Sequence, residues 1–442
     1  MKKGIIALLV VLALIVLISP GLVGRMAEKS VDDNLNWAAE ESGALVVTSE
    51  NFDRGWFSSQ GQHRVQIDGD KLKTLMGSID GAPDPGDFPV LVIDTRLDHG
   101  LIPLGSMSRE KGSLAPSLGS AVSTLSVELA DGETVDLPGA VYSKVSIGGA
   151  LSSNYVLPAG SMSEDGSTVS WDDTNIDVTT NPSSGKVSFG GDLGTLKIDD
   201  GRDVVQIDGL TFSGHQLPTE FGFATGDIKM ELGGMSVTSN GAQAGGLKYM
   251  KVDANTRVDG NKASGRTRLQ MESLPVPGFG EISVNADVSL DGANAEALGA
   301  LQQAMKRQGS NPDPAQMLGV VESDVKKLLA SGLELRVDQL DVTLPQGELT
   351  SKLDVKVGKE DSATFEWTSL LLNTEASASL SMPQGLVDMA MQMNPQVGMA
   401  ISMGFLQQNG NVYEMEAAYK KGLLTINGAP MPIPMGNFQS VS

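Results

Sequence analysis

The sequence predicts a mainly β protein with helical insertions (α+β), in which an N-terminal transmembrane helix precedes a long antiparallel, bulged and curled β-meander. Three observations lead to this prediction. Apolar and polar residues alternate strictly over 282–291, as in a strand that buries one face. Asp-Gly and Asn-Gly pairs recur along the chain at intervals typical of hairpins. An uncharged stretch, 4–24, follows two lysines at the N-terminus.

The uncharged stretch 4–24 is long enough to cross a bilayer as a helix, about 31 Å at 1.5 Å per residue. A cleaved secretory signal is the alternative, but no clean A-x-A cleavage site follows it. Lys2 and Lys3 favour a cytoplasmic N-terminus. We therefore expect a single-pass protein of the bacterial inner membrane, with a signal anchor over 1–24, a helical stalk over 25–43 and a periplasmic body over 44–442.

The body shows further strand-like alternation around 352–357, 376–382 and 413–419, which indicates half-buried antiparallel strands. The apolar positions change phase near Asp338 and at Gly209, as β-bulges would require. Bulged strands twist, so we expect a curled sheet. Two prolines indicate a weak sub-boundary near 275–281.

Two helical insertions are expected, over about 294–331 and 384–408. The second has one charged residue, Asp388, and is rich in methionine. Its apolar residues occupy nearly every helical face, so it is either buried against the sheet or exposed for binding. Flexible thioethers suit a surface that accommodates varied apolar partners. The candidate hydrophobic binding surface consists of Leu386, Met389, Met393, Val397, Met399, Ile401, Met403 and Phe405.

Composition excludes several kinds of chemistry. The net charge of −22 disfavours nucleic acid as a partner. The absence of cysteine excludes disulfides, thiolate metal sites and cysteine nucleophiles. Only three histidines occur, and the G-x-S-x-G, P-loop and H-E-x-x-H motifs are absent. We therefore predict a non-enzymatic protein with no catalytic residues, cofactor or metal, and keep a periplasmic hydrolase as a remote alternative.

Two compact motifs combine a glycine with charged neighbours: N-F-D-R-G-W-F-S-S at 51–59 and L-D-H-G-L-I-P-L at 97–104. Together with the N-terminal stretch and the C-terminal hairpin G-L-L-T-I-N-G-A-P-M at 422–431, they resemble the YdgA-like family of bacterial envelope proteins. That family is one of unknown function. The resemblance implies a membrane-anchored periplasmic protein capable of self-association, with no catalytic residues to carry over.

The motif residues are predicted to be structural, with Arg54 pairing with Asp98 or Asp53. A binding role for Arg54 and His99 is the alternative. The full set of motif residues is Arg54, Gly55, Phe57, Asp98, His99, Gly100, Pro103, Asn427 and Gly428.

Two functions are compatible with these features. In the first, the protein binds a lipid or an envelope protein through an apolar sheet face and the Met-rich helices. By architecture alone, such an anchored, curled sheet resembles the AsmA-like proteins that handle lipids between membranes. In the second, the protein is a self-associating scaffold at the periplasmic face of the inner membrane, a homodimer formed through strand edges or the helix from Gln384.

Overall fold

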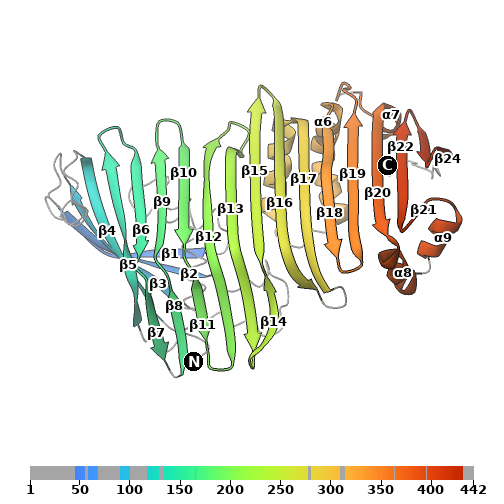
Figure 1. The fold of residues 1–442 in the computed structure, drawn as a ribbon. Coiled ribbons are helices and arrows are strands. Elements are labelled where there is room, and N and C mark those ends of the chain that lie inside the picture. The colour runs from blue at the N-terminus through green and yellow to red at the C-terminus, as the bar shows by residue number, and fades with distance from the viewer. Residues whose placement is uncertain are drawn as a thin grey trace. The chain divides into compact units, whose positions relative to one another are not determined.

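A computed structural model describes residues 45–54, 58–67, 90–99, 117–128, 134–164, 166–276, 280–308, 314–362, 364–394 and 396–431. This part of the chain is mainly β, with 24 strands in antiparallel pairing and five helices, which confirms the predicted antiparallel β fold with helical insertions (Figure 1). The predicted anchor (1–24) and stalk (25–43) lie outside the described residues. Within the described residues, no helix is long and apolar enough to span a membrane.

The chain divides into two compact units. Unit 1 comprises Met1–Pro218, Ile228–Ala244 and Gln308–Pro312, and unit 2 comprises Thr219–Asp227, Gly245–Arg307 and Asp313–Ser442. The sub-boundary predicted near 275–281 falls inside unit 2 and stays a prediction. Strands β13 (Ala224–Ser239) and β14 (Ala242–Leu247) contain residues of both units.

Unit 1 is built from strands that pair with their antiparallel neighbours. Their order is β1 (Leu45–Arg54), β2 (Ser58–Ile67), β3 (Val90–His99), β4 (Ser117–Glu128), β5 (Thr134–Ser146), β6 (Leu151–Leu157), β9 (Thr174–Asn181), β10 (Lys186–Leu193) and β12 (Asp203–Pro218). A second series leads from β12 through β11 (Leu196–Asp199) and β8 (Ser167–Trp171) to β7 (Gly160–Glu164).

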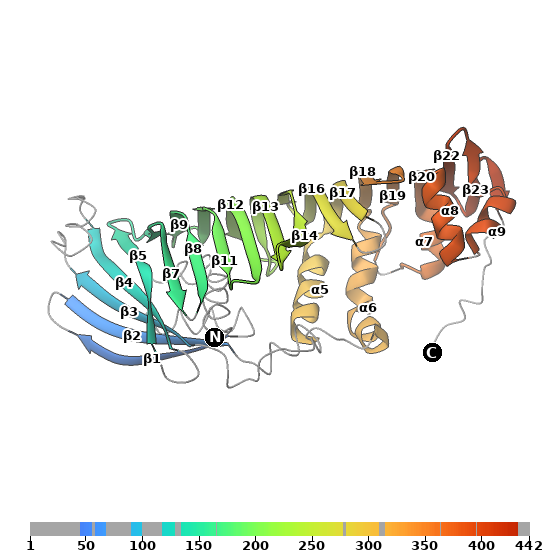
Figure 2. The ribbon, with the colours of Figure 1, turned by 60° about the horizontal axis from the view of Figure 1, so that its bottom comes forward.

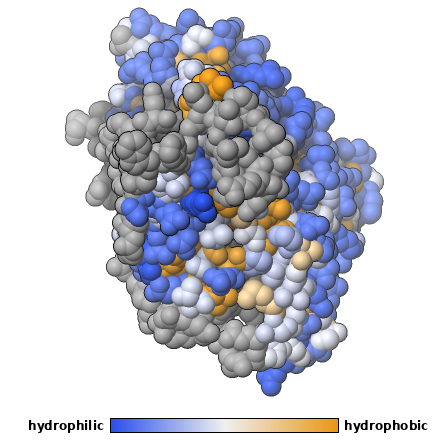
Figure 3. All heavy atoms as spheres, turned by 90° about the vertical axis from the view of Figure 1, so that its left-hand side faces the viewer, coloured by the Kyte–Doolittle hydropathy of each residue, from blue (hydrophilic) through white to orange (hydrophobic). Residues whose placement is uncertain are grey.

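Unit 1 has a closed core, because alternate residues of its strands are buried. In β9 every second side chain is buried and the others are exposed. Leu151 is 1% exposed, and Tyr155 on the same strand is buried enough to raise its pKa to about 12. Trp171 also lies in this core and donates its indole N–H to the Pro158 carbonyl at 2.8 Å. Figure 3 looks at this end of the unit, where hydrophobic residues are visible among hydrophilic ones.

The bulge predicted near Asp338 is present, and at Gly209 the strand changes its pairing partner instead. The β18–β19 register shifts between Val337 and Leu340, at the predicted position next to Asp338. In β12 the pairing passes from β11 to β10 at Asp208 and Gly209, where Gly209 has a φ of +59°. A glycine in this left-handed conformation bends the strand without ending it. The Asp208-Gly209 and Asp291-Gly292 pairs, predicted as turns, therefore lie inside strands, and that prediction was wrong at these two places.

Unit 2 is also an antiparallel meander. Its main strands pair in the order β15 (Tyr249–Asp259), β16 (Lys262–Val276), β17 (Gly280–Asn294), β18 (Glu334–Leu344), β19 (Gly347–Val357), β20 (Thr374–Pro383), β22 (Val412–Lys420), β23 (Leu423–Ile426) and β24 (Ala429–Met431). Strand β21 (Gln407–Asn409) pairs with the first residues of β22.

The helices of unit 2 are excursions between paired strands. Helices α5 (Ala295–Gln308) and α6 (Pro314–Ala330) connect β17 to β18 and lie on one side of the sheet (Figure 2). Helices α8 (Gln384–Met393) and α9 (Gln396–Ser402) connect β20 to β22. These four helices match the two predicted insertions, except that 407–409 form a strand. The short helix α7 (Trp367–Asn373) was not predicted.

Truncation of a core residue should destabilise unit 1 strongly. Leu151→Ala is expected to lower the free energy of unfolding by about 2–5 kcal/mol, because it leaves a cavity in a fully packed site. Leu118→Ala is the matched control, since Leu118 is 48% exposed, and should change stability by no more than about 0.5 kcal/mol. Urea unfolding followed by tryptophan fluorescence measures both. Equal effects of the two substitutions would contradict the closed core.

Candidate functional site

The predicted Met-rich surface is partly core. Val387, fully buried, packs with Leu406 and Tyr413 in a small cluster between α8, α9 and β22. Val397 and Ile401 of the predicted surface pack against this cluster. These two side chains therefore hold the helices to the sheet.

The rest of the predicted surface is more open. Met399 is 57% exposed and Met403 is 67% exposed, and the two lie one helical turn apart, with the Met403 N–H donating to the Met399 carbonyl at 2.8 Å. Leu386, Met389 and Phe405 are half-buried. The side chain of Met393 lies outside the described part of the structure. In the insertion predicted over 384–408, burial therefore holds for Val397 and Ile401, and exposure holds for Met399 and Met403.

A larger apolar surface lies on one face of the unit 2 sheet. The strand registers place a continuous row of apolar residues across five strands: Val288, Val337, Leu353, Ala378 and Ala417. A parallel row contains Leu290, Leu335, Val355, Ala376 and Tyr419. We call these two rows the apolar face of unit 2.

The apolar face of unit 2 is not closed in the way that the core of unit 1 is. Val288 is 36% exposed, and the other nine residues of the face are half-buried. Helices α5 and α6 cover one end of it, where Leu298 and Leu328 join a cluster with Leu290. Apolar surface that is left partly open in this way is typical of binding sites.

The opposite face of the same strands is polar, and most of its charges are paired. Arg266 binds Asp287 through two hydrogen bonds, 2.6 Å from Nε to Oδ1 and 2.5 Å from Nη2 to Oδ2. Arg268 also binds Asp287, at 3.1 Å. Arg336 binds Asp291 at 2.9 Å. Hydrogen bonds from Arg266 lower the pKa of the Asp287 carboxyl, and Asp287 in turn raises the pKa of Arg266.

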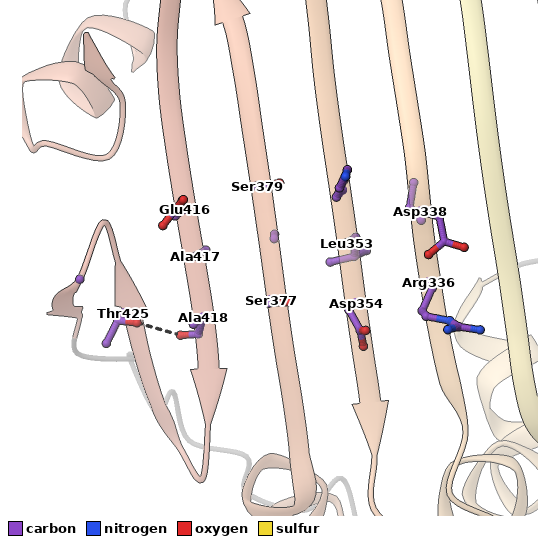
Figure 4. A pocket seen from close by; sticks show the side chains of 14 residues that line it. Arg336, Asp338, Leu353, Asp354, Ser377, Ser379, Glu416, Ala417, Ala418 and Thr425 are labelled. Atoms are coloured by element: carbon purple, nitrogen blue, oxygen red, sulfur yellow. Dashed lines mark hydrogen bonds between the residues drawn. The ribbon is translucent and has the colours of Figure 1, made fainter. Parts of the chain in front are cut away.

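A groove of about 620 Å³ lies over β18, β19, β20, β22 and β23 of unit 2. Figure 4 shows Ser377 and Ser379 on the central strand, between Asp354 on one neighbouring strand and Glu416 on the other. The register aligns Lys352 with Ser379 and Glu416, and Asp354 with Ser377 and Ala418. The small side chains of β20 and β22 therefore form a floor between longer charged side chains. We call this the polar groove.

The polar groove was not predicted from the sequence. The alternation of polar and apolar residues predicts only that its residues face solvent on their separate strands. The alternating serines of 377–381 and the charges at 352–356 were the available signal, but only the strand register shows that they meet.

The N-terminal motif residues are described only in part. Asp98 is buried in β3, between Ser58 of β2 and Ser120 of β4. Arg54 and His99 end β1 and β3, but their side chains lie outside the described part. Outside it as well are Gly55, Phe57, Gly100 and Pro103. The proposed pairing of Arg54 with Asp98 or Asp53 stays a prediction.

Histidines and carboxylates do not gather into a metal site in the part of the chain that the structure describes. His63 lies inside β2, and His215 lies inside β12, which continues to Pro218.

The C-terminal motif has a clear structural role. Asn427 and Gly428 form the turn between β23 and β24, with φ values of +50° and +77°. The Asn427 side-chain oxygen accepts the Glu416 N–H at 2.7 Å. Its amide donates to the carbonyls of Gly404 at 2.8 Å and Phe405 at 3.2 Å. Asn427 thus ties three segments of unit 2 together.

The chain matches, over residues 1–434, a family described as bacterial protein of unknown function (DUF945), and it belongs to this family. Membership confirms the bacterial family of unknown function that the motifs indicated, whereas the narrower YdgA-like resemblance stays a prediction. No curated protein and no solved structure was found to match the chain.

Loss of the Asn427 side chain should release the hairpin. Asn427→Ala removes three hydrogen bonds and is expected to cost about 2–3 kcal/mol more than Asn240→Ala. Asn240 is a matched control, because it has the same φ of +50° before a glycine but only a 3.4 Å side-chain bond to Ser239. Thermal unfolding and hydrogen exchange at 404–406 measure the difference. Equal losses would show that only backbone conformation matters.

The stability of unit 2 should depend on pH through Asp287. The folded-state pKa of Asp287 is lowered, so its contribution is present above the unfolded pKa, about 3.9, and is lost as pH falls through the folded value. Asp287→Asn should therefore lower the Tm at pH 7 and have a progressively smaller effect as the pH falls below the unfolded pKa. Asp253→Asn is the control, since Asp253 lies in the same register row, on the other side of Arg268, and has no described ion pair. A pH-independent effect of Asp287→Asn would contradict the assignment.

Proposed function

We propose that this protein is a non-enzymatic envelope protein that binds the hydrocarbon chains of a membrane lipid on the apolar face of unit 2. The observation that carries the proposal is the row from Val288 to Ala417, which is aliphatic across five strands and half-exposed. The closed core of unit 1 shows that the same alternation can be buried fully. The strand alternation alone therefore does not explain why the apolar face of unit 2 stays partly exposed.

A hydrocarbon chain suits this face chemically. Each methylene group removed from water contributes about 0.8 kcal/mol, so an extended chain gains affinity in proportion to its contact length. The backbone groups of the strands are already bonded to neighbouring strands. The face therefore offers a ligand apolar contact and few hydrogen bonds, which favours an acyl chain over a polar molecule.

The proposed location fits this ligand. The uncharged stretch 4–24 supports anchoring in the bacterial inner membrane, with the body in the periplasm. No cofactor is part of the proposal.

The alternative function is a self-associating scaffold. It is favoured by the exposed pair Met399 and Met403, since apolar side chains on the outer face of a packed helix are typical of contact surfaces.

Site-specific photocrosslinking in bacteria grown with radioactive phosphate tests the two functions. A photoreactive phenylalanine analogue replaces Val288 on the apolar face, Gln270 on the polar face, or Met403 directly after α9 of the full-length chain. We expect a labelled adduct with the mass of a phospholipid at Val288 and none at Gln270. Protease resistance of each variant verifies that it is folded.

Two results would overturn the lipid proposal. One is a folded Val288 variant without a lipid adduct, and the other is equal labelling at Val288 and Gln270. An adduct of twice the chain mass at Met403, without lipid at Val288, would support the scaffold instead.

A further inference from the structure

The polar groove contains charges that the sheet leaves unpaired. Elsewhere on the polar face several cations and anions are matched, as in Lys420 with Glu375 at 3.0 Å. Inside it, Lys352, Asp354 and Glu416 have no ion-pair partner among the residues that the structure describes, and the side chains beside them are serine and alanine. These three charges are thus paired neither with each other nor with charged neighbours.

A second observation concerns Arg336 in the groove wall. Its Nη2 group binds Asp291, but its Nε–H is buried without a hydrogen-bond partner in the described structure. The nearest carboxylate, of Glu334, lies 3.8 Å from this nitrogen, beyond hydrogen-bond distance. A buried donor without an acceptor is costly, and a bound anionic group could satisfy it.

We infer that the polar groove binds a small zwitterion with a free ammonium and a free carboxylate, the size of a dipeptide. Lys352, with Arg336 on the neighbouring strand, supplies positive charge for the carboxylate, while Glu416, two strands from Lys352 in the same register row, supplies negative charge for the ammonium. The hydroxyl groups of Ser377 and Ser379 lie between them and can bond the polar backbone of the ligand.

The size follows from the strand spacing. Lys352 and Glu416 lie two strands apart in one register row, which places their backbones about 10 Å from each other. Two charge-assisted hydrogen bonds of about 2.8 Å occupy part of that span. With an extended dipeptide of about 7 Å the total is about 13 Å, so the flexible lysine side chain must lean away from Glu416 by about 3 Å, which its four-carbon stem allows.

Ligand-observed NMR on the full-length protein in mild detergent tests this inference, which is independent of the proposed lipid function because it concerns the opposite face of the sheet. The probes are glycine, diglycine and triglycine, together with N-acetyl-diglycine and diglycine amide. We expect diglycine to bind most tightly of the five. Removal of either charge on the ligand should weaken binding about fivefold or more.

Matched variants locate the site. Lys352→Met and Glu416→Gln should each weaken diglycine binding about fivefold. Lys356 lies on β19, as Lys352 does, and Glu375 lies on β20, next to the strand of Glu416, but both are outside the groove. Lys356→Met and Glu375→Gln should therefore leave diglycine binding unchanged. The inference is overturned if no probe binds, if the blocked peptides bind as well as diglycine, or if Lys356→Met weakens binding as much as Lys352→Met. Unchanged circular dichroism verifies that each variant is folded.

Discussion

Antiparallel pairing with a side-chain period of two is the constraint on which the rest of the structure depends. Because neighbouring residues point to opposite faces, one register decides which residues meet on both faces at once. The pairing of Leu353 with Ala378 builds the apolar face, and the pairing of Lys352 with Ser379 builds the polar groove, on the same two strands. Neither surface can be moved along the sheet without moving the other.

The two units use this constraint differently. In unit 1 alternate residues such as Leu151 and Val178 are buried, and the interior is filled by side chains. In unit 2 helices α5 and α6 cover the end of the sheet near Leu290, and the row that begins at Val288 keeps partial access to solvent. The difference comes from what covers each sheet and not from the strand pattern, which is alike in both. A half-covered face gives up some stability and gains a place where a ligand can complete the packing.

Much of the fold could be predicted from the sequence because strands carry their own signal. The alternation at 282–291 and the phase change at Asp338 lie where the structure has β17 and a bulge in β18. Helix α7 escaped prediction because seven residues are too few for a helical period to be evident. The Asp291-Gly292 pair predicts a turn but lies inside a strand, because the positive φ that favours glycine is common to turns and bulges. The polar groove depends on register between β19, β20 and β22, which alternation within each strand does not encode.

Strands β17 and β18 pair directly, with Asp291 opposite Glu334, although the segment of α5 and α6 separates them in sequence. This segment is therefore an excursion from a hairpin whose two strands already hold each other. Closing a longer connection costs little extra free energy, since the entropy of closure grows only with the logarithm of its length. A chain built in this way can lengthen, shorten or exchange such excursions during evolution while the ladder beneath them keeps its register. The architecture thus separates what must stay constant, the hydrogen-bonded frame, from what is free to diverge, the cover over its apolar side.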